Sequence, residues 1–465
     1  MTIDLDAAAT SWVPRLSKGA GPLYAAIADA LAADILAGRL ADGFRLPTQR
    51  ALAEALGIDF TTVGRAYAEA GRRGLVVGRV GQGTFVRSRR RDTASDRGGL
   101  VDMSMNLPPH FDDPALVARM WEELASLRGD DGLDLLLRYQ APGGTMRDRE
   151  AGARWLEPRL GTRAPERILV CPGAQGALLA LLGVLAAPGD TIAAEALTYP
   201  GLLAAAAHMK LGVDPVALDA SGIIPEAFEE LCLRRKPKVL CVNPTLHNPT
   251  TTTVPLDRRR RLVNIARRHG VRIIEDDAYG ALAPDAPPPL AAIGEDVVYY
   301  IAGLSKCLSP ALRVAYLVAP SAGDAASLMV AIRATASMAS PLTAALATRW
   351  LETGTADATL DAIRRETKAR QAIVRSSLDG GVQMSPGAFH AWLNLPEHWT
   401  RGALVARLRA EGVGLVPSDA FAVADAPEAV RLGLGAPRSA EALKQSLDIL
   451  SHILAQRPDV STLVV

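Results

Sequence analysis

One lysine in the second half of the chain has neighbours that suit imine chemistry. Lys306 follows the apolar run Val297–Ile301, with the Ser305 hydroxyl before it and Arg313 seven residues further on. Nearby positive charge lowers the pKa of a lysine amine and makes it more nucleophilic. A hydroxyl and a guanidinium are groups that bind phosphate. The pattern indicates a Schiff base beside a bound phosphate, although a lone lysine after a strand is far more often a surface lysine.

Polar side chains with complementary chemistry follow other apolar runs of the same region. A carboxylate such as Asp276 can keep a pyridine nitrogen protonated, and Asn248 and Tyr279 can bond a ring hydroxyl. Tyr199 offers a ring for stacking, and the stretch 172–176 opens an apolar helix whose free N–H groups could hold a phosphate. Each feature alone is weak, but the ordered set matches the needs of pyridoxal phosphate.

Alternating apolar runs and helical patterns must position these residues. The runs lie at 167–171, 191–194, 239–242, 271–274, 297–301 and 314–318. Such alternation predicts an α/β fold with a mostly parallel sheet and helices on both faces. Ligands bind at the carboxyl ends of the strands in such sheets, so the polar residues are expected to meet there.

From residue 100 to about 460 the chain resembles the fold-type I aminotransferase family. The resemblance rests on Gln175, Tyr199, Asn248, Asp276, Tyr279, Ser305, Lys306 and Arg313. It implies a small C-terminal α/β subdomain beside the large sheet and pyridoxal 5'-phosphate as the cofactor. Two positions depart from the family: Ala174 replaces a common hydroxyl of the phosphate loop, and Thr251 stands where many members carry glycine.

The same resemblance implies a role for each residue. Lys306 would be the Schiff-base and catalytic residue, and Asp276 would pair with the ring nitrogen. The other cofactor contacts would be Asn248 and Tyr279 on the ring oxygen, Tyr199 on the ring face, and Ser305, Arg313 and the amides of Ala174 and Gln175 on the phosphate.

Two further residues are implied by the resemblance. Tyr139 looks like the family's tyrosine that reaches the phosphate of the partner subunit, which would make the site complete only in a homodimer. Arg431 looks like the arginine that pairs with the carboxylate of a substrate or effector, and the alternative is an arginine on a strand surface. His390 could lie by the cofactor or be a core histidine.

The N-terminal part of the chain has a different pattern. Helical spacing covers Leu23–Leu36, a second helix is expected after Thr48, and a third after the possible caps Asp59 and Thr61. Two short apolar runs around a Gly-rich turn at 75–86 predict a β-hairpin. Two short helices joined at a glycine are the helix-turn-helix arrangement, whose second helix fits the DNA major groove.

The charge of this part also suits nucleic acid. The net charge of the chain is +1, yet residues 21–91 hold eleven arginines, no lysine and six acids. A local balance of +5 favours contact with phosphate backbones. A three-helix regulatory or dimerisation cap would be about as plausible on these features alone.

The string from Leu46-Pro47-Thr48 to Gly81-Gln82-Gly83-Thr84-Phe85-Val86 resembles the GntR winged-helix family. The resemblance implies binding to double-stranded DNA. Phe60 departs from it, since the family usually carries a polar residue or arginine there. The expected DNA contacts are Thr61, Thr62 and Arg65 of the recognition helix, Arg50 on phosphate, and Arg79, Gly81 and Gly83 of the wing.

Length and composition set the remaining expectations. We expect an N-terminal extension (1–20), a winged helix-turn-helix (21–87), a linker (88–100) and an aminotransferase-like domain (101–465). The four cysteines have no metal-type spacing, and no signal peptide or membrane span is evident. A cytoplasmic protein without a metal site or a membrane role is expected.

A GntR-like winged helix joined to an aminotransferase-like domain resembles the MocR group of bacterial regulators. The resemblance implies a dimeric transcription factor that senses an amine or amino acid by imine exchange at Lys306. The alternative is an aminotransferase with an accessory DNA-binding domain, because every group required for turnover or a half-reaction is present. A sensor of pyridoxal phosphate with no amine effector is a third possibility.

Overall fold

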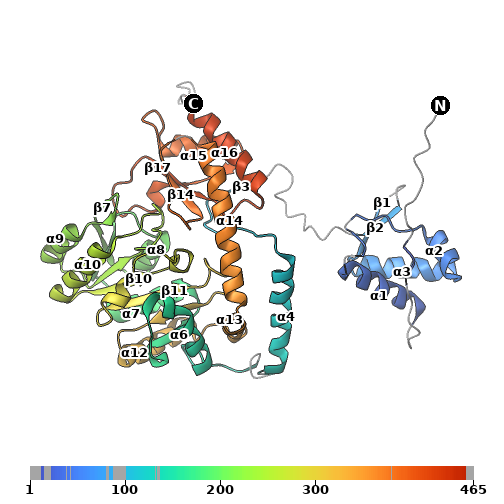
Figure 1. Cartoon of the computed structure of the whole chain (residues 1–465), viewed down its shortest axis with the longest axis horizontal. Helices are drawn as coiled ribbons and strands as arrows, with labels where there is room; N and C mark the ends of the chain where they lie inside the picture. Colours follow the sequence, from blue (N-terminus) through green and yellow to red (C-terminus); the bar gives the residue numbers. More distant parts are fainter. Residues whose placement is uncertain are drawn as a thin grey trace. The chain divides into compact units, whose positions relative to one another are not determined.

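The computed structural model describes residues 12–14, 22–37, 39–41, 43–79, 83–86, 101–130, 132, 137–378 and 380–456. The chain forms two compact units, Met1–Arg97 and Gly98–Val465 (Figure 1). The expected linker and Gly81 lie outside the described residues.

The N-terminal unit has the three helices and the hairpin that the sequence predicted. The elements are α1 (Leu23–Leu36), α2 (Gln49–Leu56), α3 (Phe60–Arg72), β1 (Val76–Arg79) and β2 (Gly83–Val86), with β1 and β2 antiparallel. The Thr48 hydroxyl caps α2 by accepting from the Ala51 N–H at 3.2 Å, and Asp59 caps α3 by accepting from the Thr61 N–H at 2.8 Å. Gly57 ends α2 with φ +63°, a conformation that glycine adopts without steric cost.

The core of this unit includes a residue that the sequence analysis placed in the N-terminal extension. Trp12 is buried with Ile27, Leu31 and Val63, and its indole N–H donates to Asp34 at 2.7 Å. A buried indole usually satisfies its N–H in this way. Trp12 therefore packs as part of the winged-helix core.

The second unit is built on a seven-stranded sheet that is parallel except for β12. The strand order is β4 (Ile168–Cys171), β12 (Ala315–Val318), β11 (Val298–Gly303), β10 (Arg272–Asp276), β9 (Val239–Val242), β5 (Thr191–Glu195), β6 (Gly212–Val216). β12 is antiparallel to both of its neighbours. The predicted mostly parallel α/β sheet is confirmed, and six of its strands coincide with the six apolar runs.

Helices cover both faces of this sheet, as the strand sequences require. Along β4, Ile168 and Val170 point into one apolar core, and Leu169 and Cys171 point into the other. Even this strand at the edge of the sheet is therefore apolar on both faces. One core contains α7 (Gly173–Leu185), α8 (Pro200–His208) and α12 (Ala322–Ala336), and the other contains α6 (Met146–Leu160), α9 (Pro225–Arg235), α10 (Leu256–His269), α11 (Leu290–Ile293) and α13 (Pro341–Thr353).

A smaller subdomain completes the unit. Its four-stranded antiparallel sheet is β13 (Val382–Gln383), β14 (His390–Asn394), β17 (Ala429–Gly433) and β16 (Val416–Pro417), with α15 (Arg401–Ala410) and α16 (Ala440–Leu454). The long helix α14 (Thr355–Ser377) lies beside α4 (Pro114–Asp130) and contacts α16 (Figure 1). β3 (Val101–Asp102) pairs with β15 (Val413–Gly414), and β7 (Leu218–Asp219) pairs with β8 (Gly222–Ile223).

No helix among the described residues is long and apolar enough to span a bilayer.

Candidate cofactor and effector site

A cavity of about 460 Å³ lies at the carboxyl ends of the parallel strands. All but one of the residues expected to hold the cofactor or effector line it. These are Ala174, Gln175, Tyr199, Asn248, Asp276, Tyr279, Ser305, Lys306, Arg313 and Arg431. Tyr139 is the exception within its own chain: its side chain is 86% exposed and does not line the cavity.

Lys306 lies three residues after the end of β11, in the turn that leads away from the sheet. Burial lowers the pKa of its amine to about 8, and the positive charges of Arg431 and Arg313 act in the same direction, whereas Asp276 opposes them. A lysine with this pKa has a substantial neutral fraction just above neutral pH. The neutral amine is the form that attacks an aldehyde carbon.

Asp276 ends β10 with a carboxylate that has an unfilled bonding position. Its Oδ1 is buried and has no hydrogen-bond partner among the described residues. Burial raises the pKa of this carboxyl to about 7, the charges of Asp277 and Glu195 raise it further, and Lys306 opposes the shift. Because a buried carboxylate oxygen requires a donor, the position fits a protonated ring nitrogen.

Two side chains at the cavity wall offer groups for a ring oxygen. Asn248 is held by its backbone N–H, which donates to the Asn243 side chain at 2.8 Å. Its own Oδ1 accepts from Arg431 Nη1 at 2.8 Å. Tyr279 is buried, which raises the pKa of its phenol, and its oxygen accepts from Asn106 Nδ2 at 2.8 Å.

Tyr199 precedes α8 and depends on a glycine two residues later. A Cβ added to Gly201 would lie 2.2 Å from the Tyr199 ring, so only glycine leaves room for the ring. The Gly201 carbonyl also accepts from Gln175 Nε2 at 2.9 Å. Tyr199 is 40% exposed, which leaves ring surface for a stacking partner.

A cradle for a phosphate lies where α7 begins. Gly173 has φ +76°, and α7 begins after Pro172 without any side-chain cap. The Arg313 guanidinium would lie 3.2 Å from a Cβ on Gly173, so the arginine closes over the helix start. Free N–H groups, the Ser305 hydroxyl and Arg313 together suit a phosphate. Ala174 supplies no hydroxyl, so its contribution there is limited to its backbone.

Arg431 lies on β17 and is 6% exposed, so it is not an arginine on a solvated strand surface. Its guanidinium lies over the Phe421 ring, 4.9 Å from the centroid, and donates to Asn248 and to the Ser104 carbonyl. Its Nε has no partner among the described residues. His390, in contrast, is a fully buried core histidine that packs against Tyr279, and its Nε2 lies 3.1 Å from the His247 carbonyl oxygen.

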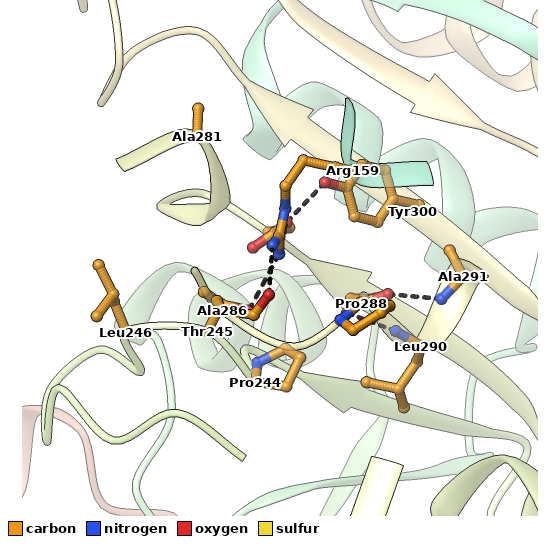
Figure 2. Close-up of polar contacts among 12 residues, drawn as sticks. Arg159, Pro244, Thr245, Leu246, Ala281, Ala286, Pro288, Leu290, Ala291 and Tyr300 are labelled. Atoms are coloured by element: carbon orange, nitrogen blue, oxygen red, sulfur yellow. Dashed lines mark hydrogen bonds and ion pairs between the residues drawn. The ribbon is translucent and has the colours of Figure 1, made fainter. Parts of the chain in front are cut away.

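A polar network contacts the loops at the strand ends on the side away from the cavity. Tyr300 donates to Asp277 Oδ2 at 2.6 Å, and Arg159 of α6 reaches the same oxygen at 3.1 Å. Figure 2 shows Arg159 beside Tyr300 and directed toward Thr245 on the neighbouring loop. Successive residues alternate at a strand end, so Asp277 is bound by this network and Asp276 faces the cavity.

Arg259 of α10 is the most buried member of this network. Its side chain has no exposed surface and donates to the Val254 carbonyl at 2.7 Å, the Pro244 carbonyl at 2.8 Å and the Thr245 hydroxyl at 3.0 Å. These acceptors belong to the loop that carries Asn248. Arg259 therefore fixes that loop from the side away from the cavity.

Asn106, Asn243 and the two network arginines, Arg159 and Arg259, were not predicted from the sequence. Asn243 Nδ2 donates to the Asp276 carbonyl at 2.6 Å, and its oxygen accepts from Asn248. Its place directly after an apolar run was a usable signal. No local signal marks Asn106, because its partner Tyr279 is 173 residues away in sequence.

The described residues among the expected DNA contacts lie on α2, α3 and the two strands of the hairpin. Arg50, Thr61 and Arg65 are exposed, and the Arg65 guanidinium lies 5.3 Å from the Tyr24 ring centroid. Thr62 is half-buried, Arg79 ends β1 opposite the exposed Gly83, and Phe60 is 47% exposed at the start of α3. The Thr61 hydroxyl donates to Asp59, so Thr61 lies in the first turn of α3 and supports the cap instead of forming it.

Two family matches cover these two units. Residues 23–86 match the family described as bacterial regulatory proteins, gntR family, and residues 99–450 match aminotransferase class I and II. Among solved structures, LysN, the α-aminoadipate aminotransferase of Thermus thermophilus, is similar over 78% of this chain and 93% of its own, with 24% identity and a TM-score of 0.68. That likeness supports the fold, and the family implies pyridoxal phosphate.

Two relatives match this chain over most of its length and most of their own. The chain is 31% identical to the uncharacterised HTH-type transcriptional regulator YdeF of Bacillus subtilis, over 96% of this chain and 97% of that protein. It is 29% identical to the HTH-type transcriptional regulator TauR of Rhodobacter capsulatus, over 87% and 90%. It is also 28% identical to a 2-aminoadipate transaminase of Thermus thermophilus, over 62% and 74%. The chain belongs to the MocR-type bacterial transcriptional regulators, in which a GntR-family helix-turn-helix domain is joined to a domain of the aminotransferase class I and II family.

Proposed function

We propose that this regulator holds pyridoxal phosphate at Lys306 and changes its affinity for DNA when an amine or amino-acid effector binds there. The observation that carries the proposal is the cavity lined by Lys306, by Asp276, whose Oδ1 has no partner among the described residues, and by the first residues of α7. Their chemistry matches an aldehyde, a ring nitrogen and a phosphate. Pyridoxal phosphate supplies an aldehyde carbon that can bond either to the lysine amine or to the amine of a ligand.

Different residues of the chain are proposed to bind different parts of the cofactor. Asp276 provides a negative charge for the ring nitrogen, and Asn248 and Tyr279 provide groups for the ring oxygen. Ser305, Arg313 and the N–H groups of Ala174 and Gln175 provide the phosphate site. Tyr139, which is exposed on its own chain, is assigned to the cavity of a partner subunit, so the proposed functional form is a homodimer.

Arg431 provides the proposed site for an effector carboxylate. Burial lowers the pKa of its guanidinium, but arginine is not deprotonated in proteins, so the group keeps its positive charge. A carboxylate that pairs with it must compete with Asn248 Oδ1, the present acceptor of Nη1. When the effector amine replaces Lys306 at the cofactor, Lys306 Nζ becomes a free amine. Effector binding would thus alter the bonds of both cations.

The experiment that tests this proposal combines two measurements on the pyridoxal-phosphate-loaded full chain. Its visible absorption is recorded while amino acids and amines are added one at a time. Its affinity for duplexes selected from a random-sequence pool is measured by fluorescence anisotropy with each compound. We expect one class of compound to shift the spectrum and to change the DNA dissociation constant at least about fivefold. A spectral shift with unchanged DNA affinity for every compound would refute it.

A second function has an observation in its favour. Lys306 lines the cavity with an amine that could move a proton beside the cofactor, and one relative that is 28% identical over 62% of this chain is named as a 2-aminoadipate transaminase. In the same titration, loss of the visible band that a 2-keto acid restores would indicate transamination. A band that shifts and then stays constant would indicate a sensor without turnover.

A further inference from the structure

The segment Val101–Pro108, here named the entry segment, opens the described part of the second unit and crosses the candidate site. β3 pairs with β15, and the Gly433 N–H donates to the Met103 carbonyl at 2.8 Å. A Cβ on Gly433 would lie 2.5 Å from the Met105 carbonyl oxygen, and one on Gly435 would lie 1.8 Å from that of Leu107. The two glycines therefore let the backbone of the entry segment pack directly on the chain at the end of β17.

Two backbone carbonyls of this segment accept from the two cations of the site. The Ser104 carbonyl accepts from Arg431 Nη2, and the Asn106 carbonyl accepts from Lys306 Nζ. These are the cations assigned above to the effector carboxylate and to the cofactor. A ligand that changes the bonds of either cation therefore changes a bond to the entry segment.

Asn106 is the residue that fixes this segment against the site. It is 7% exposed, and its Nδ2 donates to the Tyr279 oxygen at 2.8 Å. Asn106 lines the cavity, and its Oδ1 is buried and has no partner among the described residues. An unpaired buried amide oxygen is costly, so it marks a place where a ligand N–H or O–H would be stabilised.

We propose that Asn106 is a positioning residue that makes the entry segment respond to whether Lys306 is free. The proposal rests on the function proposed above. A free lysine ammonium has three protons, and a lysine nitrogen bonded to a carbon of the cofactor keeps at most one. Release of Lys306 therefore restores a donor for the Asn106 carbonyl, and the bond of Asn106 to Tyr279 holds that carbonyl in reach. The entry segment is also the first described part of the second unit, which begins at Gly98.

Amide hydrogen exchange of the full chain tests this directly. The peptide Val101–Phe111 is followed with pyridoxal phosphate alone and after addition of aminooxyacetate. This oxyamine carries a carboxylate and bonds to the aldehyde carbon, which leaves Lys306 as a free amine. We expect exchange of the amides of Asn106 and Leu107 to slow at least about fivefold in the wild type. The same comparison in Lys306→Met, which retains the cofactor cavity but has no amine, should show no such slowing. Equal slowing in both proteins overturns the proposal.

Two substitutions, one in the entry segment and one just after it, distinguish a specific role of Asn106 in the response from a merely structural role. Asn106→Leu keeps the side-chain size but removes the bond to Tyr279, and we expect it to lose the slowing while aminooxyacetate still shifts the visible spectrum. His110→Ala alters an exposed residue of the same stretch and should behave as the wild type. If Asn106→Leu retains the slowing, the proposal is wrong. If Asn106→Leu does not fold, the comparison of wild type with Lys306→Met still decides the question.

The outcome for the proposed function is measured separately, as the DNA affinity of the same samples. An entry segment that responds to aminooxyacetate with no change in DNA affinity would count against the proposed function and leave the role of Asn106 intact. A change in DNA affinity with no response of the entry segment would have the opposite meaning.

Discussion

Replacing the buried Arg259 tests whether its polar network, on the side of the strand-end loops away from the cavity, positions the cofactor site. Arg259→Met removes a guanidinium that bonds the Val254 and Pro244 carbonyls and the Thr245 hydroxyl, and whose Nη1 lies 3.9 Å from Glu275. Methionine fills similar apolar volume but leaves these groups without their donor. Breaking a buried charged pair by removing one partner costs about 3–5 kcal/mol. We expect the second unit to lose stability of that order.

The expected change in melting temperature follows from the size of the unit. Unfolding entropy is about 2.1 cal/mol/K per residue, so for Gly98–Val465 a loss of about 3–5 kcal/mol lowers Tm by about 4–6 °C. The measurement is differential scanning calorimetry of the full chain, in the transition that pyridoxal phosphate shifts upward. Arg260→Met is the matched control, because Arg260 is exposed on the same helix and its replacement should cost less than about 0.5 kcal/mol.

The cofactor affinity of Arg259→Met gives the second half of the test. Arg259 holds the loop that carries Asn248, so a loosened loop should weaken pyridoxal phosphate binding about tenfold or more. A variant that melts within 1 °C of Arg260→Met and binds the cofactor equally well would refute the argument that this network positions the site.

Three further predictions concern single groups. In the cofactor-free protein the pKa of Asp276 is raised to about 7, so the folded state binds more protons than the unfolded state between pH 4 and 7. Asp276→Asn should therefore stabilise the cofactor-free protein by an amount that grows as pH rises through this range, and it should weaken cofactor binding. Chemical denaturation at several pH values measures the difference in stability, and a difference that does not vary with pH would contradict the reasoning. Gly201→Ala places a Cβ 2.2 Å from the Tyr199 ring and should reduce cofactor affinity about tenfold in an absorbance titration, whereas Gly183→Ala, whose Cβ would make an ordinary 3.5 Å contact, should not. Arg50→Ala should weaken binding to all DNA duplexes alike and reduce the slope of the logarithm of the DNA-binding constant against the logarithm of the salt concentration by about 1. Phe60→Ala, at an exposed apolar position of α3, should leave that slope unchanged and alter the preference among base sequences.

Much of this architecture could be predicted from sequence because local patterns encode it. Six strands are short apolar runs, and the N-caps of α2 and α3 are residue types that commonly cap helices, Thr48 and Asp59 respectively. β6 was not predicted because Gly212–Val216 contains Asp214 and Pro215, which are tolerated only since this strand lies at the sheet edge. Edge position is a property of the assembled sheet and has no local signal.

The parts of the site that could not be predicted depend on long-range packing. Four consecutive arginines, Arg258–Arg261, look like a solvated helix face, yet Arg259 alone is completely buried. Thr251 was recognised as a departure from glycine, and the reason is now visible: its φ is +64°, a conformation unfavourable for a β-branched residue, and its hydroxyl accepts from the Ser385 N–H at 3.1 Å. That hydrogen bond favours threonine at position 251, and the pattern of apolar residues in the sequence does not indicate it.

Under the proposed function, the bonds around Arg431 and Lys306 favour an effector that carries both an amine and a carboxylate. Either group alone would disturb one bond of the entry segment, at Ser104 or at Asn106. An effector with both groups changes the two bonds together, and its differential affinity for the altered conformation is then the sum of both effects. Because a ligand can shift a conformational equilibrium only by its differential affinity, an amino acid should regulate DNA binding more strongly than the corresponding simple amine. A simple amine that changes DNA affinity as much as its amino-acid counterpart, at saturating concentrations of each, would show that Arg431 takes no part in the response.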